Sequence, residues 1–209
     1  MKSDQFFTVE SSSQGIFKAK GSKHLGFVFP VKSEDDVQRH LKQLRKTYHD
    51  ARHCAYAFRL EPDGIIWRAS DDGEPSNSAG PPILGALRSK ELTNCMGAVV
   101  RYFGGTKLGV SGLIEAYREA TLDAIENANI IQQWVYDHFE VRCPFDHIGT
   151  TMSMIEQYSA QLLHQEFTLD CRIQVGIRKS KAMDFHHEMN SIFGIEIRPI
   201  EDPQSTEGK

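Results

Sequence analysis

Apolar and polar residues alternate along the first part of the chain, and this pattern predicts β-strands. In the segment 25–31, Leu25, Phe27 and Phe29 fall on one face, which is typical of a half-buried strand. The segments that show this pattern most clearly are residues 6–10, 16–20 and 25–31.

Two later runs, 54–60 and 65–69, are expected to pair as a hairpin. The turn between them contains Pro62, which fixes one φ angle, and Gly64, which permits a positive one. A further apolar run at 96–103 predicts another strand.

A period of 3.6 residues predicts three helices among these strands. The first, 33–52, has Ser33 in position to cap it, acidic residues near its start and basic residues toward its end, as the helix dipole favours. The second, 83–92, follows two prolines of the kind found in a first helical turn, and the third covers about 111–127. We therefore expect an α+β layer with helices on one face of a sheet.

The pattern restarts after a boundary predicted at 127–134. The order is β-α-β-β-α-β, which is that of a ferredoxin-like domain. The helical residues expected to face its core are Ile148, Met152, Ile155 and Leu162, then Met183, His186, Met189 and Phe193. The elements are predicted at residues 139–142, 148–163, 167–169, 172–177, 180–193 and 195–197.

One strand of this second sheet has two chemically different faces. Ile173, Val175 and Ile177 alternate with polar and basic residues, so one face is expected to be apolar and the other polar and basic. A polar face of this kind can receive RNA or a protein, and simple solvation explains it equally well.

Turn-forming residues concentrate between Asp71 and Gly112. Residues 71–80 are rich in Asp, Gly, Asn, Ser and Pro, which predicts an ordered loop ahead of a helix. A second loop, which is rich in glycine, starts at Gly104 and leads into the long helix. We expect the two loops to face a common surface.

The second loop is a candidate anion site. Glycines ahead of a helix let backbone N–H groups approach a ligand, and a helix N-terminus favours negative charge. Lys107 lies within the loop and Arg101 precedes it. The glycine spacing fits neither the phosphate loop of nucleotide hydrolases nor the dinucleotide fingerprint. The alternative is that the glycines serve only tight turns and close helix packing.

The first loop offers acids that suit catalysis or structure. Asp71, Asp72 and Glu74 are candidates for a general base or a metal ligand, although turn bonds and helix caps are the commoner role of such residues. His53 precedes a buried strand, where a structural histidine is more common than a base. The neighbouring histidines elsewhere in the chain lack an acid or cysteine at a convincing spacing, so no metal site is predicted.

Composition narrows the class of protein. The 209 residues are 40% hydrophobic and 25% charged, which suffices for a real core. A net charge of -4 argues against a protein that coats nucleic acid through bulk positive charge, and it leaves open the possibility of a local basic patch.

The cysteines lie far apart in apolar runs, which is typical of buried free thiols; they are Cys54, Cys95, Cys143 and Cys171. With no signal peptide or membrane-spanning stretch in the sequence, a cytoplasmic location is expected.

Several motifs stand at fixed spacings, namely Asp71-Asp72-Gly73-Glu74-Pro75, Ser78-Ala79-Gly80-x-Pro82, Val99-Val100-Arg101-Tyr102-Phe103-Gly104-Gly105, Leu108-Gly109 and Gly112-Leu113. They resemble the signature of the IMPACT family, over about residues 14–130. His53, Ala57 and Arg59 also fit the strand that precedes the motifs in that family. Together with the second domain, the chain is similar to the bacterial YigZ-like, two-domain members.

The resemblance implies a fold and a cellular context. It implies an amino-terminal domain, residues 1–133, with the βαβ-type fold of domain IV of elongation factor G and of a small-subunit ribosomal protein. It also implies a ferredoxin-like domain at 134–200, followed by a polar tail at 201–209. In eukaryotic relatives the family is associated with translational control, whereas no reaction is implied for the bacterial members.

Two departures from the family pattern carry structural expectations. Asn77 stands where a glycine is usual, and asparagine tolerates the left-handed backbone that such a position requires. Ser111 replaces a glycine at the entry of the long helix, where it is expected to act as a cap.

The sequence favours a non-enzymatic binding protein linked to translation, which recognises RNA, the ribosome or a translation-regulatory protein. Two alternatives stay open. One is an enzyme that acts on a phosphorylated small molecule through the Gly104–Gly109 loop, with Asp72 or Glu74 as base. The other is a protein-interaction regulator without nucleic-acid contact.

No metal or other cofactor is expected. The residues expected to contact a partner or ligand are His53, Asp71, Asp72, Glu74, Ser78, Gly80, Arg101, Tyr102, Gly104, Gly105, Lys107, Gly109 and Ser111.

Overall fold

The computed structural model describes residues 4–168 and 170–202, and these divide into two compact units. The first unit contains residues 6–133, and the second contains residues 134–202 together with residues 4 and 5. Leu169, at the end of a predicted strand, and residues 203–209 of the predicted tail lie outside the described residues.

A five-stranded antiparallel sheet forms the centre of the first unit, in the order β2-β3-β6-β4-β5. Because β3 and β4 each pair antiparallel with β6, they run parallel to one another, and helix α1 connects them as a split βαβ unit. A smaller sheet pairs β1 with β7. The strands are β1 (Gln5–Val9), β2 (Ser13–Ala19), β3 (Ser22–Pro30), β4 (His53–Leu60), β5 (Ile66–Ser70), β6 (Cys95–Tyr102) and β7 (Ile130–Trp134).

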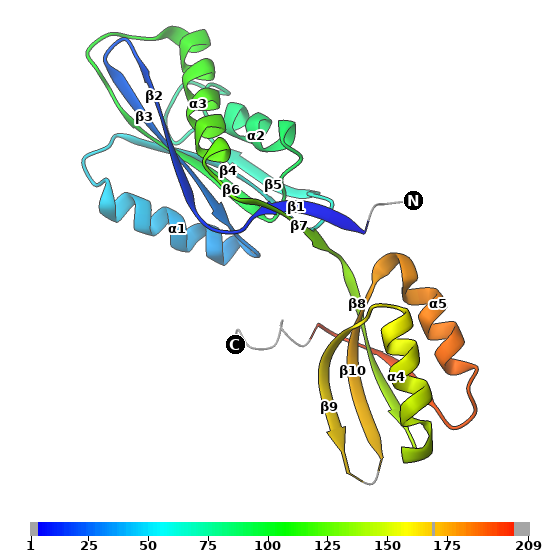
Figure 1. Ribbon diagram of the computed structural model, residues 1–209. Coiled ribbons are helices and arrows are strands. Elements are labelled where there is room, and N and C mark those ends of the chain that lie inside the picture. Colours follow the sequence, from blue (N-terminus) through cyan, green and yellow to red (C-terminus); the bar gives the residue numbers. More distant parts are fainter. Residues whose placement is uncertain (1–3, 169, 203–209) are drawn as a thin grey trace. The chain divides into compact units, whose positions relative to one another are not determined.

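Helices cover both faces of the five-stranded sheet, so the predicted placement on one face is wrong (Figure 1). Helix α1 (Glu34–Thr47) packs on the face that carries Phe27 and Phe58. Helices α2 (Gly80–Ser89) and α3 (Gly109–Glu126) pack on the opposite face. The reason is that β6 is buried from end to end on both sides, and a strand of this kind needs cover on each face.

The structure confirms the predicted helix cap, hairpin turn and apolar strand face in this unit. Ser33 caps α1 in a capping box with Asp36, as the sequence indicates, although the helix ends at Thr47 rather than at Arg52. The hairpin of β4 and β5 forms across the predicted turn, where Gly64 has a φ of +64°. The apolar face of β3 predicted from Leu25, Phe27 and Phe29 packs against α1.

Glycine lets α3 lie directly on the backbone of the sheet. Gly15 of β2 and Gly26 of β3 are directly opposite one another in the register. A Cβ atom on Gly26 would come within 2.0 Å of the carbonyl oxygen of Ala120 in α3. This close approach fixes the height of α3 above the sheet.

The second unit has the predicted ferredoxin-like arrangement. Its four-stranded antiparallel sheet has the order β11-β8-β10-β9, and α4 and α5 pack against one face. The elements are β8 (Tyr136–Cys143), the short 3-10 helix η1 (Phe145–His147), α4 (Ile148–Gln157), β9 (Gln161–Phe167), β10 (Cys171–Arg178), α5 (Lys179–Asn190) and β11 (Glu196–Ile200).

Two helical stripes predicted for this unit are partly wrong. Helix α4 ends at Gln157, and Ser159 adopts a positive φ of +52°, so Leu162 lies in β9 rather than in a helix. In α5 Met189 is buried as predicted, but Ala182 and Phe185 are buried in place of Met183 and His186. Phe193, which was expected to face the core, is 94% exposed beyond the end of the helix.

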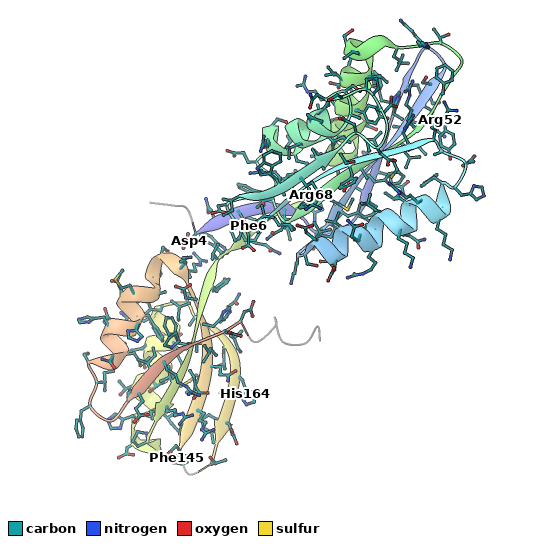
Figure 2. The ribbon with its side chains drawn as sticks, turned by 180° about the vertical axis from the view of Figure 1, so that it is seen from behind. Asp4, Phe6, Arg52, Arg68, Phe145 and His164 are labelled. Carbon is teal, nitrogen blue, oxygen red and sulfur yellow. The ribbon has the colours of Figure 1, made fainter. Side chains whose placement is uncertain are left out.

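The uncovered face of the second sheet is polar as predicted, but acids lie among its arginines, so it is not uniformly basic. Glu140 is buried and accepts hydrogen bonds from Arg142 Nε at 2.9 Å and Arg198 Nε at 3.1 Å. Arg172 pairs in register with Glu166, and His164 of β9 lies one pair further along the same face (Figure 2). Acids that neighbouring strands contribute thus offset the arginines.

Helices that span membranes need a long apolar stretch. In residues 4–168 and 170–202 no helix is long and apolar enough for this.

Replacing Gly26 by alanine is expected to lower the free energy of unfolding by about 3 kcal/mol, because the added methyl group overlaps the backbone of α3. Gly85, in α2, is the matched control. A Cβ atom there meets nothing within 4 Å, so Gly85→Ala is expected to stabilise by about 0.5 to 1 kcal/mol through helix propensity. Chemical denaturation of both variants measures the difference, and equal effects would contradict the packing described.

Candidate functional site

A cleft of about 710 Å³ opens in the first unit. It lies where the first loop, residues 71–80, meets the glycine-rich second loop, which starts at Gly104. Glu74 and Pro75 contribute from the first loop, and Lys107 and Gly109 contribute from the second. The prediction that the two loops face a common surface is therefore confirmed. The residues that line the cleft are Asp50, Arg52, His53, Glu74, Pro75, Arg101, Tyr102, Phe103, Lys107, Leu108, Gly109, Val110 and Leu113.

Strand register sets the polar residues beneath this cleft. Arg101 of β6 is opposite His24 of β3 on one side and opposite His53 of β4 on the other. Residues opposite one another in a sheet project to the same face. The three side chains therefore form a row across three strands, on the face covered by α2 and α3.

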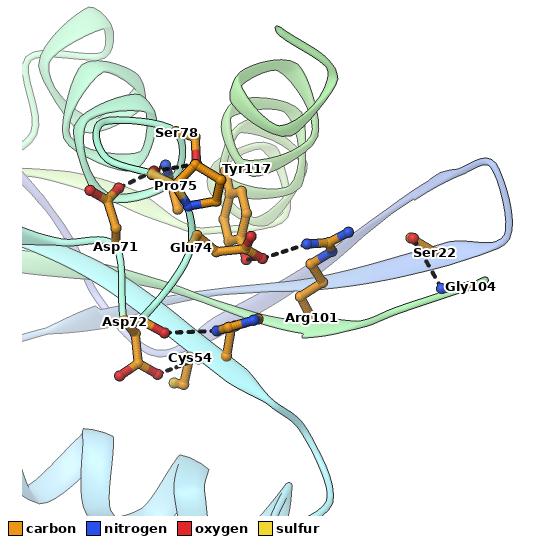
Figure 3. Close-up of polar contacts among 12 residues, drawn as sticks. Ser22, Cys54, Asp71, Asp72, Glu74, Pro75, Ser78, Arg101, Gly104 and Tyr117 are labelled. Carbon is orange, nitrogen blue, oxygen red and sulfur yellow. Dashed lines mark hydrogen bonds and ion pairs between the residues drawn. The ribbon is translucent and has the colours of Figure 1, made fainter. Parts of the chain in front are cut away.

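A buried carboxylate ties this row to the first loop and to α3. Arg101 Nη1 donates to Glu74 Oε1 at 2.6 Å, and the Tyr117 hydroxyl of α3 donates to the same oxygen at 2.8 Å (Figure 3). Only 3% of the Glu74 side chain and 10% of the Arg101 side chain are exposed. Burial, with the nearby Glu74 carboxylate, raises the pKa of Tyr117, so its hydroxyl stays a donor.

His24 completes this cluster from below. Its side chain is fully buried, and its ring meets the Tyr117 ring edge-on with the centroids 5.3 Å apart. Within the described part of the chain neither ring nitrogen has a hydrogen-bond partner. Burial, and then the positive charge of Arg101, lower the pKa of His24 to about 4. His24 is thus a neutral ring at neutral pH.

Asp71 has the structural role that the sequence favoured. Its Oδ1 accepts from the backbone N–H groups of Ala79 at 2.9 Å and Gly80 at 2.8 Å. Its Oδ2 accepts from the backbone of Asn77 at 2.8 Å, and Asn77 has the expected left-handed φ of +63°. Asp71 therefore closes the loop onto the start of α2.

Asp72 turns the other way, toward Cys54 of the sheet (Figure 3). It also fastens the loop to α1 through Arg45. Its Oδ2 accepts from the backbone N–H of Cys54 at 2.7 Å, and its Oδ1 accepts from Arg45 at 2.9 Å. Its carbonyl oxygen lies 2.8 Å from Nδ1 of His53. The carboxylate is thus engaged on both oxygens.

The remaining predicted residues of the first loop also serve packing. The Ser78 hydroxyl is buried and donates to the carbonyl oxygen of Pro75 at 2.6 Å. A Cβ atom on Gly80 would come within 2.6 Å of the backbone nitrogen of Ser70. Both residues hold the loop rather than line the cleft.

The second loop is shaped by its glycines in two ways. A Cβ atom on Gly104 would come within 1.9 Å of the Gly21 carbonyl carbon, so Gly104 serves a close backbone approach. Gly105 and Gly109 have positive φ angles of +88° and +76°, with nothing near the position of a Cβ atom. Helix α3 begins at Gly109, so Ser111 lies inside the first turn and its predicted role as a cap is wrong.

The predicted site residues thus fall into two groups, those that line the cleft and those that do not. Those that line the cleft are His53, Glu74, Arg101, Tyr102, Lys107 and Gly109, and those that do not are Asp71, Asp72, Ser78, Gly80, Gly104, Gly105 and Ser111. In the described ranges no group of three His, Cys, Asp or Glu side chains is placed to hold a metal ion.

Sequence reasoning missed several residues of the cleft. Asp50 accepts from the Tyr102 hydroxyl at 2.8 Å, and Arg52 directly precedes β4 at the end of the sheet (Figure 2). Phe103 is largely exposed, with the Arg101 guanidinium 5.7 Å from its ring centre. A signal was available, because Arg52 and Phe103 directly adjoin His53 and Tyr102, and Asp50 lies three positions before His53.

Glu74→Ala is expected to lower the free energy of unfolding by about 3 to 5 kcal/mol, because it leaves the buried charge of Arg101 without its partner. The exposed acid Glu115, on α3, is the control, and its replacement by alanine is expected to cost less than about 0.5 kcal/mol. Urea denaturation compares the two variants. A Glu74→Ala effect as small as that of the control would contradict the role assigned to the ion pair.

Stability is also expected to depend on the protonation of His24. Its pKa is about 4 when folded and 6.5 ordinarily, so below pH 6.5 the unfolded chain binds a proton that the folded chain does not. The free energy of unfolding should therefore fall as the pH drops from 6.5 to 4, by up to about 3 kcal/mol from this group. His24→Leu should flatten this part of the profile, whereas the exposed-histidine control His187→Leu should not. Unchanged slopes in His24→Leu would count against the buried neutral ring.

Comparisons with known proteins agree with this architecture. The family model of the Impact N-terminal domain matches residues 20–125. IMPACT family member YvyE of Bacillus subtilis (strain 168) is 30% identical over 187 residues, which are 90% of this chain and 86% of YvyE. IMPACT family member YigZ of Escherichia coli (strain K12) is 24% identical over 186 residues, which are 88% of this chain and 83% of YigZ.

A solved structure has a similar fold. The crystal structure of a hypothetical protein superposes with a TM-score of 0.69 at 21% sequence identity, and the match covers 95% of this chain and 98% of that one. Since the family model matches half of the sequence and YvyE aligns over nine-tenths of it, the chain belongs to the IMPACT family.

Proposed function

We propose that this chain is a non-enzymatic binding protein linked to translation, and that its cleft recognises single-stranded RNA. The observation that carries the proposal is the charge that the cleft leaves uncompensated. Arg52 and Lys107 line it and are exposed, and neither makes an ion pair with a described residue. Of the acids that line the cleft, Glu74 is neutralised by Arg101, whereas Asp50 accepts a hydrogen bond from the Tyr102 hydroxyl and keeps its charge, so the two cations exceed the free acids by one.

Aromatic and backbone groups complement these cations. Phe103 is 59% exposed at the edge of the cleft and offers a face on which a base can stack. Helix α3 starts in the cleft at Gly109 without a side-chain cap, so its first N–H groups favour an anion. Cations that follow a phosphate backbone, combined with an exposed aromatic ring, are typical of sites for single-stranded nucleic acid.

The context of the family supports a role in translation. The eukaryotic members that the signature loops resemble are associated with translational control, and an RNA site is consistent with work at or near the ribosome. A cytoplasmic location is part of the proposal. The free and buried state of Cys54, Cys95, Cys143 and Cys171 supports it, because reducing compartments keep thiols unpaired.

An enzyme that acts on a phosphorylated small molecule is the second candidate. The cleft volume of about 710 Å³ favours it, since small-molecule sites fall in that range. The bases considered from sequence fit less well, because Asp72 is held by Cys54 and Arg45, and Glu74 is held by Arg101. A base must be free to take a proton from the substrate.

The double variant Arg52→Ala with Lys107→Ala is expected to bind single-stranded RNA about tenfold more weakly at about 0.1 M salt, because two phosphate contacts are lost. The slope of log affinity against log salt should fall by about 1.4, from about 0.7 per contact. Fluorescence anisotropy with an oligouridylate of about eight nucleotides measures both quantities.

Lys42→Ala with Lys46→Ala is the charge-matched control, since both residues are exposed on α1 across the sheet from the cleft. This control should bind within about twofold of the original chain. Equal loss in both double variants would indicate nonspecific charge and contradict the proposed site. Failure of the unaltered chain to bind RNA, together with nuclease-resistant capture of one discrete protein, would replace RNA by a protein partner.

A further inference from the structure

His53 lines the cleft, and one contact of its ring defines the hydrogen-bonding character of both ring nitrogens. Its Nδ1 lies 2.8 Å from the carbonyl oxygen of Asp72. A carbonyl oxygen only accepts hydrogen bonds, so Nδ1 carries the proton in this contact. In the neutral imidazole the second nitrogen, Nε2, then has a free lone pair and is an acceptor.

The loop holds the His53 ring in one orientation. Gly73 has a positive φ of +84°, and the position of a Cβ atom there would be 3.4 Å from both Nδ1 and Cε1 of the ring. The edge of the ring that contains Nδ1 therefore faces the turn at Asp72 and Gly73. His53 also lines the cleft, and among the described residues Nε2 has no hydrogen-bond partner.

Beside this acceptor in the sequence lies a cation, Arg52, that makes no ion pair with a described residue. Arg52 lines the cleft and directly precedes His53 in the chain, whereas Arg101, directly opposite His53 in the register, is paired with Glu74. A ligand that meets these groups together presents an anion beside a hydrogen-bond donor. A carboxylate acceptor at this point would repel the anion, whereas a neutral imidazole nitrogen does not.

We infer that His53 Nε2 accepts a hydrogen bond from a ribose 2′-hydroxyl, so that the cleft prefers RNA to DNA. This rests on the proposed function and names the chemical feature that the same site reads. In an RNA strand each 2′-hydroxyl lies on the carbon next to the one that carries the 3′-phosphate, so the donor and the anion come together in every nucleotide. DNA keeps the phosphate and lacks the donor, and the 2′-hydroxyl is the group by which proteins distinguish the two.

The test compares two strands that differ only in this hydroxyl. The probes are an oligouridylate of about eight nucleotides and the matched oligodeoxyuridylate, each titrated with the full chain. The original chain is expected to bind the ribo strand about fivefold more tightly, the size of one hydrogen bond.

Two variants separate recognition from support of the loop. In His53→Gln the longer side chain places an amide oxygen near the position of Nε2 and gives up the bond to Asp72. In His53→Asn the shorter side chain places an amide N–H near the position of Nδ1 and leaves no acceptor near that of Nε2. Recognition by Nε2 predicts that the glutamine variant keeps the preference for the ribo strand and that the asparagine variant loses it.

The outcomes are distinguishable. If the asparagine variant keeps the preference for the ribo strand and the glutamine variant loses it, His53 only supports the loop. This result would overturn the inference. Equal binding of both strands by the original chain would overturn the inference while the proposed RNA site stands. Binding of neither strand would overturn the proposed function and the inference with it. The exposed-histidine variant His187→Asn is the control and should keep the original preference.

Discussion

The buried ion pair between Glu74 and Arg101 is the interaction on which the cleft depends. It joins the first loop to β6, and the Tyr117 hydroxyl extends it to α3, so three segments far apart in the sequence share one carboxylate oxygen. A buried charge is costly unless its partner is present, which makes each of these groups necessary to the others. The same pairing removes an acid from the cleft. Of the charged side chains that line the cleft, Arg52, Lys107 and Asp50 then remain, so a net positive charge is left for a ligand.

The other acids of the signature loop also work inside the fold. The carboxylate of Asp71 accepts hydrogen bonds from backbone N–H groups, and that of Asp72 accepts hydrogen bonds from Cys54 and Arg45. An acidic segment can thus border a cationic cleft without neutralising it. The uncovered sheet face of the second unit differs, because Glu140 lies among its arginines and the charges balance. The contrast is why the proposed RNA site lies in the first unit.

Much of this architecture could be predicted from sequence because it is local. The order of strands and helices follows from periodicity, and the role of Asp71 follows from the preference of aspartate for nearby backbone N–H groups. Periodicity does not show which other element the apolar face of a helix or strand packs against. It indicates that α1 has an apolar stripe, but not which face of the sheet the stripe covers. The contact between His24 and Tyr117 was not predicted for the same reason, since it depends on the close approach of β3 and α3 at Gly26.

The central claim is that RNA enters the cleft of the first unit. Amide chemical-shift mapping of the full chain, titrated with an oligouridylate of about eight nucleotides, tests it most directly. The account predicts the largest shifts at His53, Phe103 and residues 107–113, at the start of α3. Shifts confined to β9 and β10 of the second unit, or no shifts at an RNA concentration that saturates binding, would contradict it.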